Sequence, residues 1–366
     1  MTTEMVDWEL AVALGARIAG AGPQISADEA ARTVAELRAG ADRSTAYVRE
    51  FTGLEAGERT APVLVVDRPA WIRANTDGFA KLLGPVIEKV AERRGPPGPL
   101  TQAVGSRITG AEVGGLLGFM SSKVLGQFDP FYSPHESARL PGSTPPPPAS
   151  AGTPSLVAGR LLLVAPNVVH VERELEVDPH DFRLWVCLHE ETHRVQFTAV
   201  PWMRDHLFSE FLKLADTVEP QRLLDEGVKR ISEAIKNGRS ASLLDLMGSP
   251  EQKAILDRVT GVMSLLEGHA DVVMDGVGPS VIPTVDAIRG KFDERRKGVG
   301  TLDRLLRRLL GLEAKMAQYR DGARFVRAVV DKVGMADFNA VWSAPEQLPS
   351  LAEIHDPDAW ITRVHR

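Results

Sequence analysis

The part of the sequence that decides the fold is Leu184-Trp185-Val186-Cys187-Leu188-His189-Glu190-Glu191-Thr192-His193-Arg194-Val195-Gln196-Phe197. Residues four positions apart in an α-helix project from one face, so His189 and His193 would present two imidazoles to one metal ion. In such an H-E-x-x-H helix, the glutamate takes a proton from a water molecule on zinc, which lowers the pKa of that water. The motif therefore predicts a zinc site with His189 and His193 as ligands and Glu190 as the general base.

The residues around the motif favour a buried helix. Asp178-Pro179 supplies a helix N-cap followed by proline at the first helical position, and Asp181 places negative charge in the first turn. Apolar residues surround the histidines, namely Phe182, Trp185, Val186, Leu188 and Val195. The alternative is a pair of ordinary helix histidines, which would rarely fall on a capped, amphipathic helix. Cys187 lies about 200° around the helix from His189 and is expected to pack in the core.

Length and charge place the chain among ordinary globular proteins. It has 366 residues, of which 43% are hydrophobic and 25% charged, with a net charge of -6. Its short basic stretches are interleaved with acids or leucines, so no nucleic-acid partner is expected. We also expect no membrane partner, because the acidic N-terminus does not resemble a secretory signal and no long apolar run is present. A single cysteine is typical of a reducing cytoplasm, and the oligomeric state stays open.

The expected fold is a predominantly helical α+β structure with a small sheet. We expect a helical N-terminal region over residues 1–140, a proline-rich loop or linker over residues 141–155, and a metal-binding catalytic region over residues 156–366, which the resemblance given below implies to be zincin-like. The catalytic region is expected to pack against the N-terminal one. The tail over residues 345–366 reads as irregular, with Trp360 as its anchor.

Two apolar runs are candidates for strands. The shorter covers residues 63–67, and the stronger covers residues 160–171 and is split by Pro166. Because the second run leads toward the metal helix, a peptide substrate could lie along its free edge by strand addition. His170, in this run, is expected to be a surface or loop histidine.

A later helix offers the third ligand that a catalytic zinc ion needs. Ser249-Pro250 begins this helix with a capping box that Gln252 completes. Farther along it, Glu267 and Asp271 share a face because they are four positions apart, whereas His269 lies about 200° from Glu267. We therefore expect Glu267 to bind zinc and Asp271 to accept a proton from a ligating histidine in the outer shell. His269 and Asp275 are poorer candidates.

Both motifs together resemble those of known zinc peptidases. His189-Glu190-x-x-His193 with the distant Glu267 is similar to the gluzincin branch of zinc metallopeptidases, which includes thermolysin. Residues 188–197 and 266–271 more closely resemble a bacterial family of zincin-like metallopeptidases, sometimes labelled as associated with deazaflavin-coenzyme biosynthesis. The resemblance covers most of the chain and implies a zincin-type core with these ligands. Nothing in these residues supports the coenzyme label.

The resemblance also raises the question of which residue stabilises the tetrahedral intermediate. The sequence offers no match for the histidine that takes this role in thermolysin. Tyr319 is a candidate because a tyrosine takes the role in some gluzincins, although a tyrosine packed on an amphipathic helix is the commoner case.

These features predict a zinc-dependent hydrolase, most simply a metallopeptidase acting on a peptide or protein. Two alternatives stay open at this point. The same chemistry serves a non-peptide amide or ester, and an inactive zinc-containing binding protein could keep the motif in a closed cleft. The presence of Glu190 argues against the inactive protein, because a structural zinc site needs no base.

Overall fold

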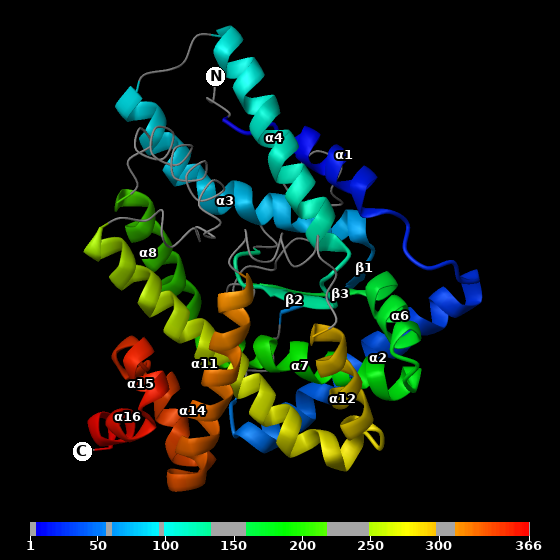
Figure 1. Cartoon of the computed structure of the whole chain (residues 1–366), viewed down its shortest axis with the longest axis vertical. Helices are drawn as coiled ribbons and strands as arrows, with labels where there is room; N and C mark the ends of the chain where they lie inside the picture. The colour runs from blue at the N-terminus through cyan, green and yellow to red at the C-terminus, as the bar shows by residue number, and fades with distance from the viewer. Residues whose placement is uncertain are drawn as a thin grey trace, which may run out of the picture. The chain divides into compact units, whose positions relative to one another are not determined.

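The computed structural model describes residues 5–55, 61–94, 99–132, 159–217, 249–297 and 312–365 (Figure 1). The chain forms two compact units, one made of Met1–Arg204 with Ser280–Val285 and the other of Asp205–Pro279 with Asp286–Arg366. The proline-rich stretch at residues 141–155 lies outside the described residues, so the division of the chain there stays a prediction. Among the helices that are described, none has the length and hydropathy of a membrane span.

The first unit combines helices with a small sheet. Its elements are α1 (Trp8–Ala19), α2 (Ala27–Thr52), β1 (Val63–Val66), α3 (Arg68–Arg94), α4 (Pro99–Ser121), β2 (Gly126–Asp129), β3 (Arg160–Val164), α6 (Ala165–Glu174) and α7 (Pro179–Ala199). Helix α8 (Pro201–Thr217) begins at the end of this unit. The prediction of a mainly helical α+β fold with a small sheet is confirmed.

The sheet has three strands in the order β1-β3-β2. Strand β1 runs parallel to β3, with Val63 opposite Leu161, and β2 runs antiparallel to β3, with Gly126 opposite Leu163. Every residue of β3 is buried, and the sheet lies between α3 and α7 (Figure 1). The expectation that β3 offers a free edge is wrong, because both of its sides are already paired. In this sheet, β1 and β2 are the outer strands.

The apolar run over residues 160–171 is part strand and part helix. The strand ends at Val164, and Pro166 lies in the first turn of α6. Proline is tolerated there because the N–H that it lacks would have no helical partner. His170 is exposed on α6, and its Nε2 lies 3.7 Å from Glu174 Oε2. It is a surface histidine, as expected, but not a loop residue.

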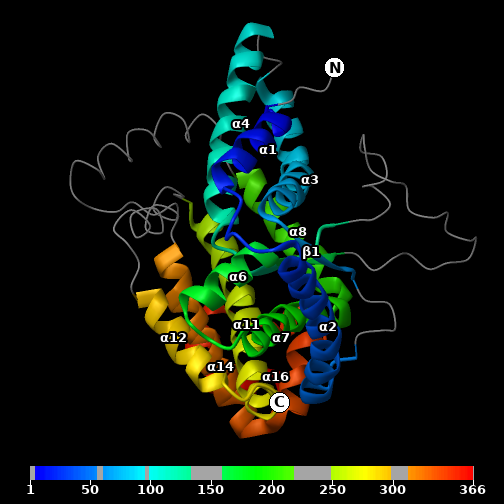
Figure 2. The ribbon, with the colours of Figure 1, turned by 90° about the vertical axis from the view of Figure 1, so that its right-hand side faces the viewer.

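Helices α1 and α4 pack with their backbones in contact, side by side in both views (Figures 1 and 2). Three glycines of α4 lie on the contact face, spaced four residues apart. A Cβ atom added at Gly110, Gly114 or Gly118 would lie 2.4 to 2.8 Å from a backbone oxygen of the α1 segment. The glycines of α4 therefore let the two helices pack closely.

The second unit is built around two crossing helices. Besides most of α8, it contains α11 (Pro250–Val281), α12 (Val285–Lys297), α14 (Leu312–Phe338), η1 (Asn339–Trp342), η2 (Pro345–Gln347), α15 (Leu351–His355) and α16 (Pro357–Val364). The predicted capping box of α11 is present, with Gln252 N donating to Ser249 Oγ at 3.1 Å and Ser249 N to Gln252 Oε1 at 3.3 Å. Helices α11 and α14 cross at Gly268 and Gly322. A Cβ atom at Gly322 would lie 1.8 Å from the carbonyl oxygen of Ser264.

The expectation of an irregular C-terminal tail is wrong. Ser350 and Glu353 form a capping box at the start of α15, and the side chain of Asp356 caps α16 by accepting from Ala359 N. These short polar caps satisfy the free N–H groups that begin each helix. Trp360 is buried and its Nε1 donates to Gln347 O at 2.8 Å, which confirms its role as the anchor.

Candidate metal centre

Helix α7 begins where its sequence predicts. Asp178 caps it by accepting from Asp181 N at 2.9 Å, and Pro179 is the first helical residue. The carboxylate of Asp181 is also held, because its Oδ2 accepts from Thr284 N at 2.9 Å and from Thr284 Oγ1 at 2.7 Å. The helix ends at Ala199, just before Pro201. Both ends of the helix that carries His189 and His193 are thus defined by local chemistry.

One face of α7 is fixed against α2. Cys187 Sγ donates to Leu37 O at 3.4 Å, and a Cβ atom at Gly40 would lie 3.1 Å from the same sulfur. Burial raises the pKa of the Cys187 thiol, so this cysteine is a packing residue, as expected. Nearer the start of the helix, Arg183 pairs through two nitrogens with Glu172 and through a third with Glu36. These contacts hold the helix while its other face presents the histidines.

A buried polar cluster next to the motif strengthens this attachment. Arg194 Nε donates to Glu191 Oε2 at 2.7 Å, and its other nitrogens donate to Ala61 O and Thr45 Oγ1. Thr45 Oγ1 donates in turn to Glu191 Oε2 at 3.1 Å. Burial raises the pKa of Glu191 to about 7, although Arg194 and Thr45 both favour its charged form. Glu190 and Glu191 therefore have different environments despite being neighbours in sequence.

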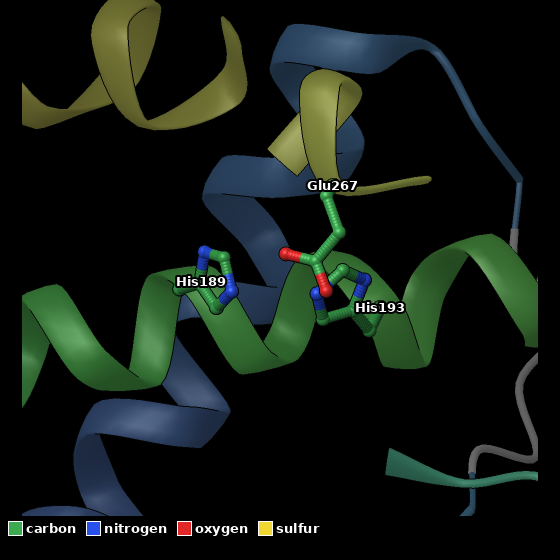
Figure 3. Close-up of side chains that lie close together, drawn as sticks. All are labelled: His189, His193 and Glu267. Carbon is green, nitrogen blue, oxygen red and sulfur yellow. The ribbon is translucent and has the colours of Figure 1, made fainter. Parts of the chain in front are cut away.

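The two motif histidines lie together on α7. Their ring centroids are 4.9 Å apart with the rings perpendicular. His189, His193 and Glu267 each offer one ligand atom, and these atoms all lie within 4.8 Å of one another. In Figure 3 the Glu267 carboxylate, on α11, points toward the two rings. All three side chains are half-buried. Two imidazoles and one carboxylate are a set that could hold a metal ion.

His193 has a partner that the sequence interpretation missed. Its Nδ1 lies 2.9 Å from Oε1 of Gln196, which is buried. An amide oxygen accepts hydrogen bonds and does not donate them, so a hydrogen bond between these two atoms requires the proton on Nδ1. This tautomer leaves Nε2 with the lone pair that binds metal. The three-residue spacing on a helix was the available clue, because residues i and i+3 are neighbours.

We expect Gln196→Leu to weaken zinc binding by about 10- to 100-fold, as is typical when the partner of a ligating histidine is lost. The leucine cannot accept a hydrogen bond, so the ring would no longer be held in one tautomer. Competition with a chromophoric chelator measures the affinity. Gln196→Glu keeps an acceptor oxygen and is expected to retain most of the zinc affinity. Equal affinity of the leucine variant and the parent chain would exclude this role for Gln196.

Glu190 occupies a different place from the three clustered side chains. It is 8% exposed, and the end of its side chain lies directly against Gly126 of β2. The sequence interpretation missed Gly126 because it did not expect a strand there. A four-residue strand containing glycine carries little periodicity, so sequence alone gave no clue.

The other residues considered as site candidates make contacts of their own. Asp271 lies one turn after Glu267 and is not part of the three-residue group; Arg289 donates to its backbone oxygen. His269 is buried, and its ring stacks on Phe338 with centroids 5.7 Å apart. Asp275 forms ion pairs with arginines of its own unit, Arg289 and Arg327. The Tyr319 side chain lies outside the described residues.

Comparison with known proteins identifies the relatives of the chain as a whole. The chain is similar to a protein of Chloroflexus aurantiacus, and the similarity covers 99% of each of the two chains. The crystal structure of that protein is described as that of a candidate hydrolase with a novel fold. The two share 29% identity with a TM-score of 0.68. No curated protein matches. The sequence pattern of the zincin-like metallopeptidases matches residues 6–361. With nearly its whole length matched and its two motif histidines paired on one helix, the chain belongs to the zincin-like metallopeptidase family.

Proposed function

We propose that this chain is a zinc metallopeptidase, with His189, His193 and Glu267 as metal ligands and Glu190 as general base. The observation that carries the proposal is the convergence of the three ligand atoms within 4.8 Å. Membership of the zincin-like metallopeptidase family supports the reaction class. The description of the Chloroflexus aurantiacus protein as a candidate hydrolase supports it more broadly.

The donor set suits zinc better than a harder ion. Imidazole nitrogens combined with one carboxylate are typical of catalytic zinc sites, whereas magnesium and calcium prefer sites made of oxygen atoms. A hydrogen bond from His193 Nδ1 to Gln196 Oε1, two atoms that lie 2.9 Å apart, would leave the other ring nitrogen available. Three protein ligands would leave one position open for water or substrate.

Zinc and Glu190 would have different roles in the proposed reaction. Zinc, when bound, polarises a scissile carbonyl and lowers the pKa of water. Glu190 would take the proton from the attacking water and then deliver it to the leaving amine. Because Glu190 is 8% exposed, few water molecules compete for its carboxylate. The attachment of α7 to α2 would keep the base and the histidines in a fixed relation.

A peptide-library assay tests the proposal. The zinc-loaded protein is incubated with a mixture of peptides, and new termini are identified by mass spectrometry, with Glu190→Gln as the matched control. Cleavage that a chelator stops and added zinc restores is the expected result. Parallel wells contain aryl esters and non-peptide amides. Hydrolysis confined to those compounds would replace the peptidase proposal with the broader hydrolase class.

We also propose that Asp271 acts in the outer shell and does not bind the metal. Asp271→Asn is expected to keep zinc, with affinity or activity lowered by about 10- to 100-fold. The asparagine has nearly the same shape, but its amide oxygen is a weaker hydrogen-bond acceptor than a carboxylate. Metal analysis and a structure of the zinc form give the answer. A direct bond from the Asp271 carboxylate to zinc, together with complete metal loss in the variant, would contradict the assignment.

The proposed partner is a peptide or protein substrate, and the proposed location is the cytoplasm. The chain has one cysteine, and that cysteine is buried on α7. A buried, unpaired thiol with a raised pKa suits a reducing compartment.

A further inference from the structure

The two faces of β2 contact different helices. On one face, Phe128 stacks on Phe197 of α7 with ring centroids 5.2 Å apart. On the other, the amide of Gln127 exchanges hydrogen bonds with the amide of Asn75 on α3, at 2.9 and 3.2 Å. Side chains alternate along a strand, so position 126 faces the same side as Phe128. Gly126 therefore faces α7.

The space beside Gly126 is occupied by the end of Glu190. A Cβ atom built on Gly126 would lie 2.5 Å from Glu190 Cγ, 2.6 Å from Cδ and 2.8 Å from Oε1. Distances this short do not occur between real, unbonded atoms, so no other residue fits at position 126 while Glu190 keeps its place. All three of the nearest atoms belong to Glu190. The clash is thus specific to the side chain proposed as the base.

The backbone at Gly126 gives no other reason for glycine. Gly126 is not among the described residues with positive φ, so an alanine could adopt its conformation without strain. The strand itself is held by β3, since Val164 N donates to Leu125 O at 2.8 Å and Gly126 lies opposite Leu163. The backbone at Gly126 therefore forms a fixed surface against which the Glu190 carboxyl group rests.

We propose that Gly126 is a positioning residue for Glu190. The missing side chain lets the carboxylate lie against β2, and the strand then prevents it from turning further toward the sheet. A general base must lie within hydrogen-bond reach of the proton that it takes, so a displaced carboxylate loses most of its effect. The consequence for hydrolysis rests on the proposed function, whereas the effect on the position of Glu190 does not.

The first test is a crystal structure of the zinc-loaded Gly126→Ala variant beside that of the parent chain. The added methyl group is expected to displace the Glu190 carboxylate while β2 and the histidines stay in place. A carboxylate that keeps its position would overturn the proposal. Gly115→Ala on α4 is the matched control, because a Cβ atom there would have no neighbour within 4 Å.

Kinetics and metal content give the second readout, with the library peptide that is cleaved fastest as substrate. Gly126→Ala is expected to lower kcat by about 10- to 100-fold, less than the full loss of a general base because the carboxylate is displaced and not removed, with zinc content and KM nearly unchanged. In a Glu190→Gln background the same substitution is expected to cause no further loss. An equal additional loss in that background would show that Gly126 acts through some other group. If Glu190→Gln is itself fully active, the proposed base fails, and the crystal structure still decides whether Gly126 positions the side chain.

A third comparison covers the case in which Gly126→Ala does not fold. Glu190→Ala removes the three atoms that would lie nearest to the methyl group. The double variant Gly126→Ala/Glu190→Ala is then expected to fold and to melt within a few degrees of Glu190→Ala alone. Failure of the double variant to fold would show that glycine is needed there for another reason, and would overturn the proposal.

Discussion

Glu190→Gln is expected to lower kcat by about 100- to 10,000-fold while zinc stays bound. Glutamine has nearly the shape of glutamate and can fill the same space beside Gly126, but its amide cannot accept and return a proton. Glu190 is not one of the three clustered candidate ligands, so the metal site should be intact. Hydrolysis of a library peptide, zinc content and the melting temperature are measured on the same sample. Unchanged turnover would remove Glu190 from the mechanism.

The neighbouring residue provides a sharp control for that result. Glu191 is buried and accepts from Arg194 and Thr45. Glu191→Gln weakens a buried ion pair, a change that costs up to about 3–5 kcal/mol when one partner is lost. It is expected to lower the melting temperature, with a much smaller effect on kcat per folded molecule. The two substitutions would thus have different effects: Glu190→Gln would mainly lower kcat, and Glu191→Gln would mainly lower the melting temperature.

Glu267→Ala is expected to reduce zinc content sharply at matched protein concentration. Two imidazoles alone leave a catalytic zinc ion short of one protein ligand, and the carboxylate also lowers the net charge of the site. The Glu267 carboxylate points toward both rings (Figure 3). Metal analysis after dialysis against a buffered zinc concentration gives the comparison. A variant that keeps its zinc would contradict the assignment of Glu267.

His269→Ala is the matched control for this experiment, because His269 lies two residues away on the same helix. Its ring is buried beside Phe338 and Trp342, so the substitution creates a cavity and lowers stability. Zinc content per folded molecule is nevertheless expected to stay almost intact. The reverse order, with zinc lost from His269→Ala and kept by Glu267→Ala, would replace the proposed site by one of three histidines.

Features that depend on local sequence were predicted well. The N-cap at Asp178 and the capping box at Ser249 appear where the sequence places them, because each involves side chains within three residues of the backbone that they satisfy. The capping box at Ser350 carried the same kind of clue and was overlooked. Pro166 was interpreted as a break in a strand although it begins a helix. Proline is compatible with both, so the sequence did not decide between them.

Two contacts between parts of the chain that are distant in sequence could not be predicted. The central place of β3 follows from its pairing with β1 and β2, which come from separate parts of the sequence. The contact between Gly126 and Glu190 joins residues 64 positions apart, and nothing near either residue indicates it. By contrast, the contact of Gln196 with His193 lies within one helical turn and could have been found.

The hydrogen bonds from Thr284 to Asp181 bear on how this protein can be divided. Thr284 belongs to a six-residue segment, Ser280–Val285, that returns to the first unit after the chain has built much of the second. A recombinant fragment that stopped at Arg204 would include His189, Glu190 and His193 but would leave the buried carboxylate of Asp181 without its threonine partner. The first unit is therefore made of two separate segments of the chain, and no single continuous fragment contains it without part of the second unit. During synthesis, the first unit is expected to complete its folding only after residue 284 has been added. The start of the metal-binding helix thus depends on a threonine that is 103 positions farther along the chain.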